Sequence, residues 1–101
     1  MKAWRVLSTE DSDGLSMDDL EPPALADGVL IDVKAVGIGY PDLLMRRGEF
    51  QIPQPVPFTL GWEAAGVVAE VRGESRFTLG DRVLTMTFGA CAEQMIAPSP
   101  A

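Results

Sequence analysis

The chain has 101 residues, of which 47% are hydrophobic, and it carries a formal net charge of −7. This length supports one domain with a modest core, and the apolar runs are far shorter than the roughly 20 residues that cross a membrane. The acidic balance opposes binding to nucleic acid and to anionic lipid, and no basic segment leads into an apolar secretory signal, so we expect a cytoplasmic protein.

The first quarter of the chain predicts two short strands. Residues 1–7 alternate in polarity, residues 8–14 form a polar turn, and residues 15–20 supply a partner strand. Pro22 and Pro23 then end the pairing, because proline has no N–H to donate.

Residues 30–36 give the clearest strand signal and lead into a short helix. One face of the strand is apolar, made of Val29, Ile31, Val33 and Ala35, and the opposite face includes Asp32 and Lys34. Pro41 is suited to the first turn of a helix that continues to Arg46, and Gly48 ends it. Prolines then make residues 53–58 a stiff extended connector.

Residues 60–68 predict a tight turn followed by a strand that passes close to other backbone, because Ala64, Ala65 and Gly66 are small. Beyond them the alternation places Val67, Ala69 and Val71 on one face, and Val68 and Glu70 on the other.

Two more strands are expected at residues 82–87 and 91–96, after turns near residues 72–75 and 79–81. Many short strands with a single short helix predict a mainly β domain, built as a small barrel or a sandwich. Cys91 is the only cysteine and histidine is absent, which excludes an intrachain disulfide and a zinc cluster of Cys and His ligands. Without a histidine to activate it, Cys91 is expected to be a small core side chain in the last strand.

The residues Gly61-x-Glu63-Ala64-Ala65-Gly66-x-Val68 resemble a motif of the medium-chain dehydrogenase/reductases. Further similar segments are residues 27–38 and 79–83, and the zinc-independent, quinone oxidoreductase-like branch is resembled at residues 40–44, 47–51 and 55–58. The resemblance implies a GroES-like, partly open β-barrel with one short helix. It also implies that residues 1–101 are an incomplete domain of this kind, without the nucleotide-binding Rossmann domain.

The same resemblance bears on zinc. Metal-using relatives have a Cys where Gly39 stands and a His where Trp62 stands, and neither glycine nor tryptophan can ligate zinc. We therefore expect no catalytic metal. Hydride reduction of a quinone or enone then leaves negative charge on an oxygen that hydrogen-bond donors must stabilise.

Tyr40 and Asp42 are the candidate catalytic residues. Tyr40 is the sole tyrosine and brings an O–H donor; its alternative role is an aromatic packed on the barrel. The backbone N–H groups at the helix start add a weak positive end, and Arg46 and Arg47 are expected to be surface residues. Asp42, in the first helical turn, is explained first by the exposed N–H groups there, and by resemblance it lines the nicotinamide cleft as a second role.

Gly39, Trp62 and Glu63 are the candidate residues of the substrate cleft. Many relatives carry Asn at the position of Gly39, so no amide contact to substrate is expected from it. Trp62 is a wall or packing residue that could stack on a flat quinone, and Glu63 either pairs with a cation or forms a wall of the cleft. Gly37-x-Gly39 lacks the third glycine of a dinucleotide fingerprint, and Asp42 would repel a pyrophosphate there.

By resemblance, the expected function is the amino-terminal catalytic portion of a zinc-independent, NADPH-dependent quinone or enone oxidoreductase. Because hydride transfer needs a cofactor held against the substrate, the isolated chain is expected to be inactive, with its nucleotide-binding residues in an absent domain. An incomplete barrel would also expose a sheet edge liable to pair with a second copy. The alternative is a stand-alone GroES-like binding or assembly module without activity.

Overall fold

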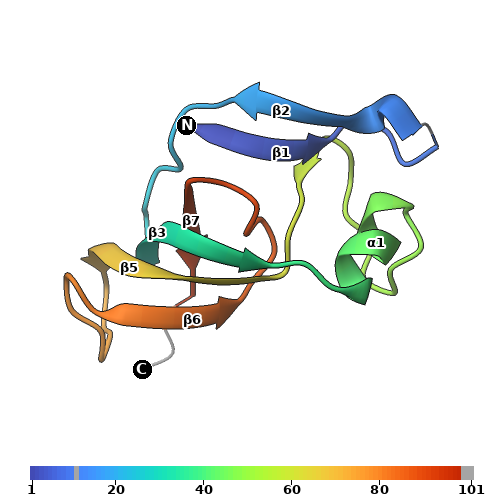
Figure 1. The fold of residues 1–101 in the computed structure, drawn as a ribbon. Helices are drawn as coiled ribbons and strands as arrows, with labels where there is room; N and C mark the ends of the chain where they lie inside the picture. The colour runs from blue at the N-terminus through green and yellow to red at the C-terminus, as the bar shows by residue number, and fades with distance from the viewer. Residues whose placement is uncertain (11, 99–101) are drawn as a thin grey trace.

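A computed structural model describes residues 1–10 and 12–98, and within them the chain is mainly β, with two open sheets and one α-helix (Figure 1). The elements in chain order are β1 (Lys2–Val6), the 3₁₀ turn η1 (Ser12–Gly14), β2 (Leu15–Asp19), β3 (Gly28–Gly37), α1 (Tyr40–Arg46), β4 (Phe58–Thr59), β5 (Glu63–Arg72), β6 (Arg82–Met86) and β7 (Gln94–Ala97). The expected pairing of the first two strands is confirmed.

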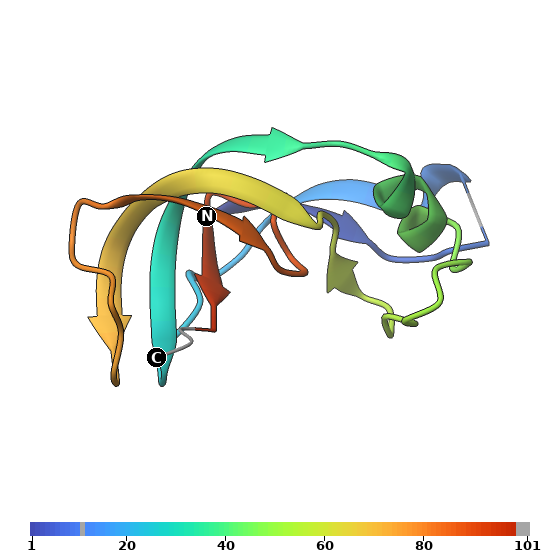
Figure 2. The same ribbon diagram turned by 90° about the horizontal axis from the view of Figure 1, so that it is seen from below.

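The three-stranded sheet has the order β2-β1-β4, and the four-stranded sheet has the order β6-β5-β3-β7, with all pairs antiparallel. Strands β3 and β5 are the longest and bend strongly along their length (Figure 2). The segment before β7 joins the two sheets, because the Cys91 carbonyl accepts from the Trp4 N–H at 2.9 Å and Ala3 bridges Ala92.

A bulge in β5 overturns the predicted faces of that strand. Leu30 pairs with Glu70 but Ile31 pairs with Val68, so Ala69 is an extra residue without a partner. Val68 is therefore buried in the same core cluster against which Val71 packs, although strict alternation placed the two valines on opposite faces.

A second register shift lies in β3, where Val33 pairs with Gly66 and Ala35 pairs with Ala65. Lys34 is the extra residue here, and Ala35 is exposed rather than on the core face with Ile31. The predicted close backbone approach is confirmed at Gly66, because a Cβ there would collide with the backbone oxygen of Asp32.

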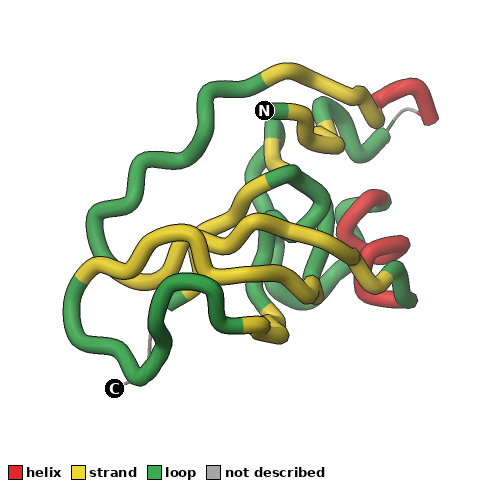
Figure 3. The backbone as a smooth tube through the Cα atoms, turned by 60° about the vertical axis from the view of Figure 1, so that its left-hand side comes forward, coloured by secondary structure: helices red, strands yellow, loops and turns green. Residues whose placement is uncertain are grey.

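The core divides into two clusters of buried side chains that share the partly buried Val36. The first lies under the four-stranded sheet and contains Val29, Ile31, Ala64, Val68, Ala90, Met95 and Ala97. The second lies near the helix and contains Val6, Met45, Phe58, Leu60 and Cys91. Figure 3 shows both helical segments, η1 and α1, at the same end of the molecule.

The last strand is shorter than predicted, since β7 begins at Gln94 and Cys91 lies in the preceding loop. Cys91 is nevertheless buried, as expected of a small core side chain. Among the described residues, no helix has the length and apolar character needed to cross a membrane.

Candidate active site

The register of β3 and β5 brings the two halves of the candidate site to one end of the sheet. Gly37, the last residue of β3, lies directly opposite Glu63, the first residue of β5. Gly39 follows Gly37 by two residues and Trp62 precedes Glu63 by one, so both leave the sheet at the same end. Helix α1 begins immediately after Gly39.

Helix α1 starts as the sequence predicted, with Pro41 in its first turn. Gly39 caps the helix in an extended conformation, and its N–H donates to Oδ2 of Asp42 at 2.8 Å. The Asp42 N–H donates back to the Gly39 carbonyl at 3.2 Å. After the last turn, Gly48 has a φ of 72°, which a glycine adopts without strain.

Asp42 is the one charged side chain buried among the described residues, with 4% of its surface exposed. Its Oδ2 caps the helix, but its Oδ1 is buried and has no hydrogen-bond partner in the described part of the chain. A buried carboxylate oxygen without a donor costs about 1–3 kcal/mol or more. Helix capping therefore explains the position of Oδ2 but not the burial of Oδ1.

We predict that Asp42→Asn stabilises the chain by about 1 kcal/mol. The amide keeps an oxygen that can accept from the Gly39 N–H and removes the buried negative charge, a gain that exceeds the loss of its attraction to the helix start, about 0.3–1 kcal/mol. Urea denaturation near neutral pH measures the change. Asp42→Ala is the control, because it removes the cap as well and should be less stable than Asp42→Asn by about 1 kcal/mol. An Asn variant that is less stable than the original chain would contradict this prediction.

Tyr40, the first residue of α1, leaves 71% of its surface exposed. The Tyr40 ring is therefore not packed on the barrel, which was its alternative role. Its hydroxyl is available to a ligand or to solvent. The helix start offers few other donors, because Pro41 has no N–H and the N–H groups of Gly39 and Asp42 bond to each other's oxygens. Arg47 is exposed, as expected, and Arg46 donates to the Ser8 carbonyl at 3.3 Å.

Trp62 belongs to an aromatic cluster with Phe50 and Phe88. Its ring centroid lies 4.6 Å from that of Phe88 and 6.4 Å from that of Phe50, and all three rings pack against the second core cluster. The structure thus favours the packing role of Trp62. The side chain stays partly exposed, so its free surface is available as a wall of the cleft. Sequence reasoning missed Phe50 and Phe88 as partners of Trp62, because they come from loops distant in the chain. Their aromatic character was the one signal in the sequence that could have suggested the contact.

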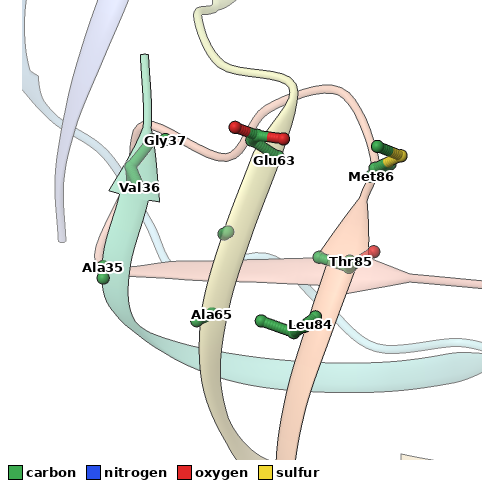
Figure 4. Close-up of a pocket in the computed structure, with 9 residues that line it drawn as sticks. Ala35, Val36, Gly37, Glu63, Ala65, Leu84, Thr85 and Met86 are labelled. Carbon is green, nitrogen blue, oxygen red and sulfur yellow. The ribbon is translucent and has the colours of Figure 1, made fainter. Parts of the chain in front are cut away.

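Glu63 lines a groove on the outer face of β3, β5 and β6, with a volume of about 640 Å³ (Figure 4). Small residues of β3 and β5 make its floor and Leu84 and Met86 of β6 make its side. The Glu63 carboxylate rests over Gly37, where a Cβ would collide with it. No cation pairs with Glu63 among the described residues, so the structure gives no support to the alternative in which Glu63 forms an ion pair.

Cys91 lies beneath the turn that precedes β5, where its N–H donates to the Leu60 carbonyl at 2.7 Å. Burial, with a further contribution from the negative charge of Asp42, raises the pKa of the Cys91 thiol from 9.0 to about 11. A thiol with so high a pKa is a poor nucleophile near neutral pH.

The described residues contain no group of three Cys, His, Asp or Glu side chains that could hold a metal ion. The helix start does not suit a phosphate either, since the Asp42 carboxylate already occupies the Gly39 N–H. The start of the helix is thus neither a dinucleotide fingerprint nor another kind of phosphate site.

The two open antiparallel sheets with one short helix define a GroES-like domain. Residues 26–99 match the alcohol dehydrogenase GroES-like domain family, and the chain belongs to that family. The predicted GroES-like, mainly β fold is thereby confirmed.

Its relatives include oxidoreductases of the medium-chain dehydrogenase/reductase superfamily. The chain is 38% identical over 93 residues to quinone oxidoreductase-like protein 2 of Mus musculus, covering 89% of this chain and 27% of the mouse protein. A probable oxidoreductase from Mycobacterium abscessus superimposes with a TM-score of 0.89 at 39% identity, over 97% of this chain and 32% of that one.

A quinone oxidoreductase from Thermus thermophilus, solved also in complex with NADPH, has a TM-score of 0.80 at 32% identity, over 97% of this chain and 30% of that one. The chain therefore resembles an oxidoreductase and spans about a quarter to a third of these relatives.

Proposed function

We propose that the chain is the amino-terminal catalytic portion of a zinc-independent, NADPH-dependent oxidoreductase that delivers hydride to a quinone or an enone. The observation that carries this proposal is the pairing of Gly37 with Glu63, which sends Gly39 and Trp62 out of the sheet at the same end, beside the exposed Tyr40. Both positions hold residues that cannot ligate zinc. Relatives named as quinone oxidoreductases support the choice of substrate.

The chemistry assigned to this chain is polarisation of a carbonyl without a metal. When hydride adds to a conjugated carbonyl compound, negative charge develops on its oxygen, and the Tyr40 hydroxyl donates a hydrogen bond to it. Trp62, held by Phe50 and Phe88, forms an apolar wall against a flat ring. Asp42 fixes the backbone at Gly39 and so positions the first residue of the helix.

Among the described residues, the start of α1 does not fit the phosphates of NADPH. The Gly39 N–H is used by Asp42, and the chain has an excess of acidic residues. We assign cofactor binding to a nucleotide-binding domain outside this chain, and the cofactor held there supplies the hydride.

The 101-residue chain alone should therefore show no turnover when NADPH oxidation is followed with several quinones. Replacing the matching segment of the Thermus thermophilus enzyme by residues 1–101 gives a chimera that should reduce quinones with NADPH and lose no activity to a zinc chelator. In that chimera, Tyr40→Phe should lower kcat by about 10–100-fold with little change in KM, because the lost donor acts chiefly in the transition state.

Thr78→Val is the matched control, since it also removes an exposed side-chain hydroxyl, in the turn before β6 and at the far end of the β5–β6 pair from Glu63. It should leave kcat unchanged. Turnover by the isolated chain, activity that a chelator abolishes, or a Tyr40→Phe chimera as active as its parent would each contradict the proposal.

A stand-alone assembly module is the second candidate, and it is favoured by the outer edge of β6, which pairs with no other strand that the structure describes. The chimera separates the two functions, because a domain that no longer serves a reductase would leave it inactive with both coenzymes and all quinones tested.

A further inference from the structure

Strand β6 ends the four-stranded sheet, so one of its sides has no neighbouring strand within residues 1–10 and 12–98. Its other side pairs with β5, with Val83 opposite Gly66, Leu84 opposite Ala65 and Thr85 opposite Ala64. An unpaired strand edge presents free N–H and C=O groups and can pair with another strand.

The hydrogen bonds of β5 reveal which groups of β6 point outward. The Val68 N–H donates to the Asp81 carbonyl at 2.9 Å, so Val68 directs its backbone groups toward the β6 side. Because this direction alternates along an antiparallel strand, Val83 and Thr85 bond inward to β5. Arg82, Leu84 and Met86 consequently direct their N–H and C=O groups to the open side.

The side chains beside this edge are unusually apolar for a surface. Leu84 is 86% exposed and Met86 is 67% exposed, and both border the groove in Figure 4. Exposed apolar patches of this kind mark interaction sites. Charges of opposite sign lie at the two ends of the patch, with Glu63 opposite Met86 and Arg82 at the start of the strand.

We propose that the β6 edge binds a second copy of this chain by antiparallel pairing about a two-fold axis at Leu84. In this register Leu84 faces Leu84 of the second copy, and Arg82 faces its Met86. Every outward backbone group of β6 then finds a partner, whereas an axis at Val83 or at Thr85 leaves one end of the edge unpaired. The two four-stranded sheets become one continuous sheet.

The charges fit this pairing and identify the partner as a copy of the chain. Residues directly opposite one another in antiparallel strands share a face, so Glu63, Met86 and Arg82 of the second copy form one row across the sheet. Arginine is long enough to reach over Met86 to the Glu63 carboxylate, and the two-fold axis creates the same pair twice. A patch with opposite charges at its ends and an apolar centre is complementary to itself.

Sedimentation equilibrium of the 101-residue chain tests the proposal. We expect the average mass to rise toward twice that of a single chain at concentrations up to about 1 mM. Leu84→Lys should weaken the association at least tenfold, because it places like charges opposite one another at the axis. Leu79→Lys is the matched control, since Leu79 is also exposed but lies in the turn before β6, and it should not change the association.

A charge exchange tests the register. Arg82→Glu should weaken the dimer several-fold, and adding Glu63→Arg in a double variant should restore it. In a sample that mixes isotope-labelled and unlabelled copies, NMR should show contacts between the backbone amides of Arg82 in one copy and Met86 in the other. Circular dichroism verifies that each variant is folded. A chain that stays monomeric at about 1 mM, or a dimer that Leu84→Lys leaves intact, would overturn the proposal.

Discussion

Gly61→Ala should destabilise the chain by about 3–5 kcal/mol, a large fraction of the stability of a domain of this size. Gly61 has a φ of 113°, which costs an L-residue about 1–2 kcal/mol or more. An added Cβ would also lie only 2.5 Å from the backbone nitrogen of Cys91. That nitrogen donates to the Leu60 carbonyl, so moving it away breaks a bond that closes the turn.

Urea denaturation measures this loss, and Gly89→Ala is its control. Gly89 has a φ of 93°, but no atom of the described residues lies within 4 Å of the position that its Cβ would take. Gly89→Ala should therefore cost only the backbone strain, about 1–2 kcal/mol. Equal losses in the two variants would mean that the contact with Cys91 contributes nothing.

Cys91 should react with iodoacetamide about 100-fold more slowly in the folded chain than in the urea-unfolded chain at about pH 8. The reactive species is the thiolate, and raising the pKa of the thiol from 9.0 to about 11 lowers the thiolate fraction by this factor. Mass spectrometry of the alkylated chain gives both rates. Asp42→Asn should raise the rate in the folded chain, because the negative charge of Asp42 is one cause of the high pKa.

The same pKa has a consequence for stability at alkaline pH. The folded chain holds the Cys91 proton more tightly than the unfolded chain, so this contribution to stability is complete below pH 9.0 and is lost as the pH rises toward about 11. Cys91→Ala should lose less stability than the original chain across this range. Rates within tenfold of each other in the folded and unfolded chains, or an identical loss of stability in the variant, would contradict the assigned pKa.

Local signals in the sequence predicted the elements well. Pro41 and Gly48 placed the beginning and end of the helix, because each has a backbone preference that acts without a partner. The small residues before Val67 predicted a close approach of backbones, and Gly66 provides it. These features depend on a few adjacent residues.

Features that depend on a partner strand were not predictable. The bulges at Lys34 and Ala69 arise because β3 and β5 pair in a shifted register, and alternation within either strand alone cannot reveal the extra residue. In the candidate site, the sequence named Asp42 as a candidate residue but gave no sign that its Oδ1 is buried without a hydrogen-bond partner among the described residues. It also missed the aromatic cluster of Phe50, Trp62 and Phe88, since contacts between distant loops leave no local pattern.

The bond between the Trp4 N–H and the carbonyl of Cys91 joins two segments that lie 87 residues apart in the sequence. Strand β1 therefore cannot complete its contacts until residue 91 has also been synthesised. Long-range pairing of this kind slows folding, because the chain must close a large loop before the contact stabilises it. Until residue 91 has been synthesised, the apolar side chains of β1 therefore lack their native neighbours and are accessible to chaperones.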